Sequence, residues 1–221
     1  MVMRKAGFIL LPLLLSAPTL AAPGTHTVPY KEFFDQMARF YGQDNDRLVL
    51  RLSVQPAKDT EPLDVPVTMS VTINGQTQPI TLDAHNAVAL DYRPDWVEQG
   101  AMVTINQARE TYVMRAQIGM KMPSGTQTLR YAEVQAAFDQ FNRLIEKEAG
   151  MVSFLAPSAK TLRVFCGPAC TVTLKGDKGS KDLTPDDKGR VNIANDKALM
   201  RQYPDIVISN PVAYTVLTTK G

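Results

Sequence analysis

The sequence predicts an α+β protein, mainly β, with two tandem β-sandwich or β-meander modules, each preceded by a helix. Short apolar runs separated by turn residues fill residues 48–120 and 162–218, which is typical of sandwiches and meanders. Two segments with helical spacing of apolar residues, 29–41 and 131–150, each stand before such a stretch. Strands do not alternate with long crossover helices, which argues against a Rossmann-like parallel sheet.

Residues 1–21 have the pattern of a signal peptide. Arg4 and Lys5 form a positively charged start, residues 6–15 form a short apolar core, and small residues lead up to Ala21. The apolar core is shorter than the roughly 20 residues that span a bilayer, and no cysteine follows it to carry a lipid anchor. We therefore expect export to the periplasm, cleavage after Ala21, and no stable membrane insertion afterwards.

The first predicted module covers residues 22–125. Phe33, Met37 and Phe40 recur at helical spacing within 29–41. Asn74 and Gly75 predict a hairpin turn, because both residues tolerate positive φ. A short helix is expected at 94–99, and strands are expected at 48–54, 65–73, 79–82, 88–90, 102–105 and 112–120.

The second predicted module covers residues 126–221. Its helix begins near Tyr131, keeps one apolar stripe through Phe138 and Ile145, and ends at Gly150. The strands expected after this helix are 162–165, 170–174, 191–193, 206–208 and 213–218.

The succession of a helix and a meander therefore occurs twice, which suggests a tandem duplication. Tyr30 matches Tyr131 and residues 71–75 match 172–176 at a spacing of 101 positions, and residues 88–105 match 191–208 at 103 positions. Two unrelated meanders can also be aligned in part by chance, and the helix lengths and first loops differ. Both explanations stay open at this point.

The helix start with Tyr30, Phe33 and Phe34, together with residues 187–193, 204–209 and Pro211, resembles an uncharacterised gammaproteobacterial family of exported proteins that carry a domain of unknown function. The resemblance implies a Gram-negative periplasmic setting and supplies no catalytic residue. The pattern Asp-x-Gly-x-Val-x-Ile at 187–193 is also similar to a turn and strand of transthyretin-like accessory modules. That likeness implies a β-sandwich appendage rather than an enzyme.

Cys166 and Cys170 flank a Gly-Pro-Ala turn that resembles the Cys-Gly-Pro-Cys motif of thioredoxin-type oxidoreductases with one residue inserted. Redox activity needs the first thiol at a helix N-terminus, where the helix dipole lowers its pKa. Here the second cysteine leads into a strand. Export to an oxidising compartment favours a structural disulfide that fixes a hairpin between strands 162–165 and 171–174, with a redox pair or free thiols as alternatives.

The remaining polar motifs do not predict a metal, cofactor or catalytic site. His26 lies near the new N-terminus, where we expect a mobile tail, and His85 lies in a polar turn. Neither histidine has a partner at ligand spacing. The acidic residues at 44–46 and 186–187 fit Asx turns better than a calcium loop. The sequence contains no nucleophile elbow, P-loop or dinucleotide-binding fingerprint.

Tyr92 and Trp96 are spaced like one face of a short helix. They could line a groove for a sugar or a peptide, or fill the space between sheet layers as an apolar plug. We name both as candidate groove residues.

The formal charge of +2 comes from 24 basic and 22 acidic residues. Arg4 and Lys5 are the charged residues of the signal peptide, so the exported protein has no net charge, which does not favour nucleic acid as a partner. We expect an exported, non-enzymatic binding or structural module of the cell envelope, whose partner is an envelope protein or polymer. The alternative is a hydrolase that acts on envelope polysaccharide or peptide through carboxylates that the sequence does not single out.

Overall fold

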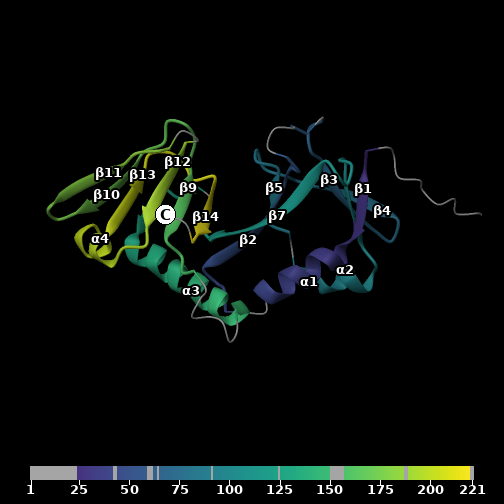
Figure 1. Cartoon of the computed structure of the whole chain (residues 1–221), viewed down its shortest axis with the longest axis horizontal. Coiled ribbons are helices and arrows are strands. Elements are labelled where there is room, and N and C mark those ends of the chain that lie inside the picture. Colours follow the sequence, from purple (N-terminus) through teal and green to yellow (C-terminus); the bar gives the residue numbers. More distant parts are fainter. Residues whose placement is uncertain are drawn as a thin grey trace, which may run out of the picture.

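A computed structural model describes residues 24–41, 44–58, 62–63, 65–90, 92–123, 125–149, 157–186 and 189–219 (Figure 1). Within these residues the chain forms four antiparallel sheets and four helices, which confirms the expected mainly β, α+β class. The proposed signal peptide, 1–21, lies outside the described residues. No helix in the described part of the chain is long and apolar enough to cross a membrane.

The first half of the chain forms two sheets. The four-stranded sheet has the order β1-β6-β3-β4 and contains β1 (His26–Pro29), β6 (Met102–Ile105), β3 (Met69–Ile73) and β4 (Gln76–Ile80). The three-stranded sheet has the order β5-β2-β7 and contains β5 (Ala87–Val88), β2 (Leu48–Pro56) and β7 (Tyr112–Met120). Helix α1 (Tyr30–Tyr41) follows β1, and the short α2 (Pro94–Glu98) follows β5.

The second half forms two more sheets. The four-stranded sheet has the order β11-β10-β13-β8 and contains β11 (Gly179–Leu183), β10 (Val172–Gly176), β13 (Asp205–Ile208) and β8 (Thr128–Arg130). The three-stranded sheet has the order β12-β9-β14 and contains β12 (Arg190–Ala194), β9 (Thr161–Phe165) and β14 (Tyr214–Thr218). Helix α3 (Tyr131–Ala149) follows β8, and α4 (Lys197–Gln202) follows β12.

Every element of the first half has a counterpart in the second, in the same chain order and with the same neighbours in each sheet. The two long helices also begin alike: the N–H of Tyr30 donates to Ala101 O at 2.8 Å, and the N–H of Tyr131 donates to Pro204 O at 2.8 Å. Each accepting carbonyl belongs to the residue just before β6 or β13. Residues at matching positions in the two halves are called counterparts below.

Strand register defines these counterparts and corrects one of the sequence matches. Met69 lies opposite Ile105 in β6, and Val172 lies opposite Ile208 in β13, so positions 69 and 172 correspond at a spacing of 103. Residues 71–75 therefore correspond to 174–178. The sequence match of 71–75 with 172–176 was two residues out of register, because the Val-Thr pair occurs at different points of the two strands.

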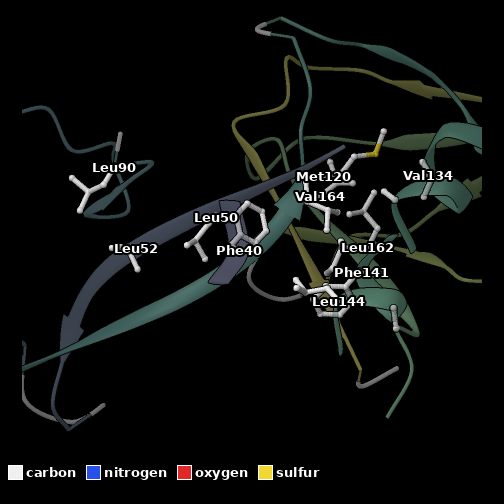
Figure 2. Close-up of a cluster of buried hydrophobic side chains, with 14 of the residues drawn as sticks. Phe40, Leu50, Leu52, Leu90, Met120, Val134, Phe141, Leu144, Leu162 and Val164 are labelled. Atoms are coloured by element: carbon white, nitrogen blue, oxygen red, sulfur yellow. The ribbon is translucent and has the colours of Figure 1, made fainter. Parts of the chain in front are cut away.

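Buried apolar side chains of both halves form one continuous cluster. Figure 2 shows Phe40 and Leu50 of the first half in the same cluster as Phe141 and Leu162 of the second. The long strands β2 and β7 run between the two lobes of the molecule (Figure 1). The halves thus share a core instead of burying two separate ones.

Most predicted elements lie within a few residues of their expected positions, and the turn at Asn74 and Gly75 has the expected positive φ values of 49° and 77°. The strand expected at 65–73 begins only at Met69. Three strands were not predicted: β1, β8 and β11. Their sequences are short or polar, and pairing with β6, β13 and β10 makes them strands.

Candidate functional site

The candidate groove residue Tyr92 belongs to an exposed aromatic cluster on the first half. Its ring stacks on Phe34 of α1, with ring centroids 4.6 Å apart and an angle of 8° between the planes. Tyr41, at the end of α1, lies 5.3 Å from Tyr92. Tyr41 and Tyr92 are each 38% exposed. We call Phe34, Tyr41 and Tyr92 the aromatic face.

Trp96 is not part of this exposed cluster and packs against the core. Its ring meets Tyr30 edge-on, with centroids 5.1 Å apart, while the guanidinium of Arg93 lies 5.0 Å above it. Arg93 also donates hydrogen bonds to Asp95 at 2.6 and 2.9 Å, and these hold the pKa of Asp95 below its ordinary value. Trp96 therefore packs on Tyr30 and the core, and of the two candidate groove residues it is Tyr92 that contributes to the exposed surface. A position of Trp96 between sheet layers stays a prediction.

In the second half, the counterparts of the aromatic face are amides: Gln135, Asn142 and Asn195. Asn142 Oδ1 accepts a hydrogen bond from Ala159 N at 2.7 Å, and Asn195 Nδ2 donates to Ala159 O at 2.9 Å. Ala159 is only 1% exposed. Asn142 and Asn195 thus hold the extended residues that lead into β9 against this face of the second half, while Gln135 donates to Asp139 of the same helix.

In the first half, the segment that leads into β2 takes a different course from the segment that leads into β9. Strand β12 pairs with β9 from Arg190 to Ala194, whereas β5 pairs with β2 only at Ala87 and Val88. The start of β2 instead runs along β7 toward α3, where Gln140 accepts from Arg47 N at 3.0 Å and donates to Asp44 O at 2.7 Å. The aromatic face is therefore not covered by the segment that covers its counterpart.

A second polar cluster joins the two halves around Arg51 of β2. Arg51 is 7% exposed and pairs through Nη2 with Asp83. Its guanidinium carbon lies 3.9 Å above the ring of Tyr214 in β14. Tyr214 in turn stacks on Phe165 of β9 at 4.0 Å, and the ring of His85 lies 4.8 Å from Tyr214.

Burial raises the pKa of the Tyr214 hydroxyl, with a smaller opposing effect from Arg51 and a further upward effect from Asp83. Of these residues the sequence motifs include His85, which lies exposed in a turn as expected. The alternation of Leu48, Leu50 and Leu52 places Arg51 on the face of β2 expected to meet solvent. Tyr214 of β14 and Asp83 cover it on that face.

The two halves also meet where β14 approaches the end of β7. Thr215 Oγ1 accepts from Met120 N at 2.8 Å and donates to Met120 O at 3.1 Å. A Cβ at Gly119 would lie 2.2 Å from the carbonyl oxygen of Thr215. The approach of the two strands therefore requires glycine at this position.

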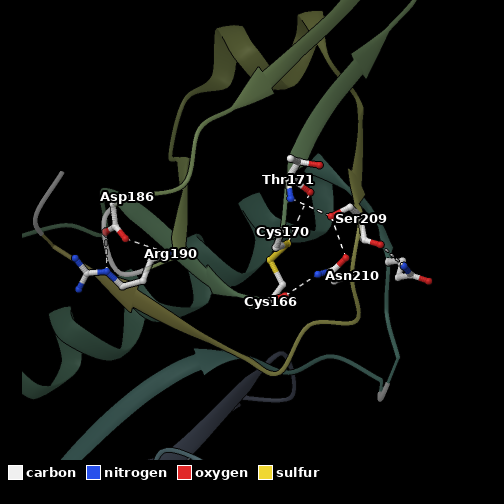
Figure 3. Close-up of a disulfide and its surroundings, with 8 residues drawn as sticks. Cys166, Cys170, Thr171, Asp186, Arg190, Ser209 and Asn210 are labelled. Atoms are coloured by element: carbon white, nitrogen blue, oxygen red, sulfur yellow. Dashed lines mark hydrogen bonds and ion pairs between the residues drawn. A yellow bond between two sulfur atoms is a disulfide. The ribbon is translucent and has the colours of Figure 1, made fainter. Parts of the chain in front are cut away.

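Cys166 and Cys170 form the expected disulfide, with Cα atoms 5.5 Å apart (Figure 3). Its expected role in a hairpin is wrong. Strand β9 belongs to the three-stranded sheet and β10 to the four-stranded one, so the bridge fixes the corner at which the chain passes between sheets. Asn210 Nδ2 donates to Cys166 O at 3.3 Å and joins β13's end to the same corner.

His26 is not in a mobile tail. It pairs with Ile105 in the β1–β6 ladder, and its Nδ1 shares a 2.6 Å hydrogen bond with the hydroxyl of Tyr112. The β6 backbone offers β1 a partner, which a search for local sequence patterns does not reveal.

The acidic turns at Asp46 and Asp186 have hydrogen-bond partners within the protein. Asp46 accepts from Gln140 Nε2 at 2.7 Å, which lowers the pKa of Asp46. Asp186 accepts from the N–H and the Nε of Arg190 at 2.9 and 2.7 Å (Figure 3). Among the described residues, no three His, Cys, Asp or Glu side chains lie close enough together to hold a metal ion.

A model of the family described as "Protein of unknown function (DUF2987)" matches residues 23–165. The chain belongs to this family. The DUF2987 match covers the first half, α3 and β9, and therefore includes the aromatic face and Arg51 but not Tyr214. Comparison with curated proteins and with solved structures gave no match. Membership confirms the expected uncharacterised family. The gammaproteobacterial origin and the transthyretin likeness stay predictions.

Proposed function

We propose that the protein is an exported, non-enzymatic binding module of the cell envelope, and that its aromatic face binds an extended polypeptide segment of an envelope partner. The observation that carries the proposal is the contrast between counterparts. The second half covers this face with its own extended chain, held at Ala159, whereas the first half presents three aromatic rings.

The chemistry of the rings supports a binding role. Tyrosine adds large contact area at small conformational cost, and it is enriched among the residues that dominate protein interfaces. The Phe34–Tyr92 stack already holds the Tyr92 ring in place, so a partner would lose little freedom of that side chain on binding. A neutral exported chain also fits recognition by shape and local contacts rather than by net charge.

The export part of the proposal has separate support. The start of the chain has the charge, apolar core and small residues of a signal peptide. The Cys166–Cys170 disulfide is compatible with an oxidising compartment. Mass measurement of the protein from a cell envelope fraction tests both: we expect a chain that starts at residue 22 and contains no free thiol.

Site-specific photocrosslinking tests the binding surface. A photoreactive phenylalanine analogue replaces Tyr92 in one variant and Val65, another exposed apolar residue, in the control. We expect one reproducible polypeptide adduct from position 92 only, with a yield that falls several-fold when Tyr41→Ala is added. Equal adducts from both positions, or a yield that Tyr41→Ala leaves unchanged, would contradict the proposal.

The alternative from the sequence, a hydrolase of envelope polysaccharide or peptide, stays a prediction. Incubation of the mature protein with purified envelope polymer tests it, since hydrolysis releases new reducing ends or amino groups.

A further inference from the structure

A cavity of about 280 Å³ lies at the junction of the two halves. Arg51, Asp83 and Tyr214 provide polar groups in its lining, and the apolar residues of the lining include Met120, Met122, Pro123 and Val212. Cavities between packed units are common sites for small ligands, and a few convergent polar groups in an apolar lining are typical of them.

The Arg51 side chain is not fully satisfied in this cavity. Its Nη2 donates to Asp83, but its Nη1 is shielded from solvent and has no hydrogen-bond partner among the described residues. The Tyr214 ring covers the face of the guanidinium and stabilises its charge. The N–H donors of a guanidinium lie in the plane of the group. A ring stacked on its face therefore cannot accept from Nη1, and Nη1 still lacks an acceptor oxygen.

Asp83 supplies the opposite charge at the same cavity. Its Oδ1 accepts from His85 N at 2.8 Å and from Ala87 N at 3.1 Å, which fixes the carboxylate in the turn. Its Oδ2 faces Arg51, and its side chain is 39% exposed whereas that of Arg51 is 8% exposed. The cavity therefore has a buried cation and, beside it, a more accessible anion.

This arrangement discriminates between ligand charges. A ligand with a net negative charge is attracted by Arg51 but repelled by Asp83, and a ligand with a net positive charge is attracted by Asp83 but repelled by Arg51. In either case the repulsion cancels part of the attraction. A zwitterion gains from both groups. The volume lies just below the range of about 300–1,000 Å³ that holds drug-sized molecules, which fits a single amino acid.

We propose that the junction cavity binds a free α-amino acid with an apolar side chain. On binding, the shielded Nη1 of Arg51 must turn into the cavity to donate to the ligand carboxylate, the ammonium donates to Asp83 Oδ2, and the side chain contacts the apolar residues. Met120 and Met122 are unbranched and adaptable, so the apolar lining adjusts to the side chain of the ligand. The site contains no residue of the aromatic face and is independent of the function proposed above.

Isothermal titration of the mature protein with three probes tests this inference. The probes are L-leucine, N-acetyl-L-leucine, which lacks the ammonium, and L-leucinamide, which lacks the carboxylate. We expect heat of binding with L-leucine and at least about tenfold weaker binding of the other two, because each loses a charge-assisted hydrogen bond.

Two variants connect binding to the cavity. Asp83→Asn keeps the size of the side chain and removes its charge, so L-leucine should bind it no better than N-acetyl-L-leucine. Asp95→Asn, in an exposed ion pair with Arg93, is the matched control and should bind like the wild type. Circular dichroism confirms that both variants are folded. The inference is overturned if L-leucine gives no heat at 10 mM, if all three probes bind equally, or if folded Asp83→Asn keeps the preference for L-leucine.

Discussion

The substitution Gly119→Ala tests the contact that joins the two halves. Its Cβ would lie 2.2 Å from the backbone oxygen of Thr215, about 1 Å inside ordinary contact, so β7 or β14 must move. Overpacking of this kind costs about 1–3 kcal/mol. The movement also pulls Thr215 Oγ1 away from Met120 N and O, and a buried unpaired backbone group costs about 1–3 kcal/mol more.

We therefore expect Gly119→Ala to lower the free energy of unfolding by about 4 kcal/mol and the melting temperature by about 10 °C for a chain of this size. Urea and thermal unfolding followed by circular dichroism measure both. Ala116→Ser, an exposed change of similar size in the same strand, should shift the free energy of unfolding by less than about 0.5 kcal/mol. A loss below about 1 kcal/mol for Gly119→Ala would refute the packing of β14 on β7.

Three further predictions concern other contacts. Replacing Cys166 and Cys170 by serine should lower the free energy of unfolding by about 2 kcal/mol, the chain-entropy value for so short a loop, as measured by urea unfolding. Thr215→Val, of nearly equal volume, should cost about 1–3 kcal/mol in the same assay, because the β7 backbone loses both side-chain hydrogen bonds. Burial, with a smaller effect of Asp196, raises the pKa of Tyr131 to about 12. The unfolded chain loses this proton first, so stability should fall between about pH 10 and 12, and Tyr131→Phe should flatten that fall in stability curves recorded against pH.

Local sequence patterns were sufficient for the elements whose periodicity is strong. The apolar stripe of α3 and the alternation in β6 and β7 gave their bounds to within one residue, because burial on one face imposes a period that the sequence retains. Strand β11, with the sequence Gly-Ser-Lys-Asp-Leu, has no such period. It is a strand because β10 offers a complete row of backbone partners.

The sites were less predictable because they also depend on contacts between residues far apart in the sequence. The disulfide follows from two cysteines four positions apart and the expected export, but the sheet to which each flanking strand belongs depends on pairings distant in sequence. Arg51 is the clearest case. On a strand with one apolar face, a charged residue on the other face is expected to meet solvent, and its burial depends on Tyr214, which lies outside the stretch matched by the family model.

The pairing of β2 accounts for both surfaces to which we assign a role. Strand β12 pairs with β9 over five residues, whereas β5 pairs with β2 at only two, Leu52 and Ser53. The first part of β2, from Leu48 to Arg51, pairs with β7 and not with β5. Because β2 follows β7, the segment before β2 does not cover the aromatic face, whereas the segment before β9 covers the corresponding face of the second half. The same course brings Arg51 to Tyr214 of the other half. Two units with the same strand order therefore differ in how far β5 and β12 pair with the neighbouring strand. In the first half β2 is left to follow β7, so the aromatic rings stay exposed and Arg51 lies at the junction cavity.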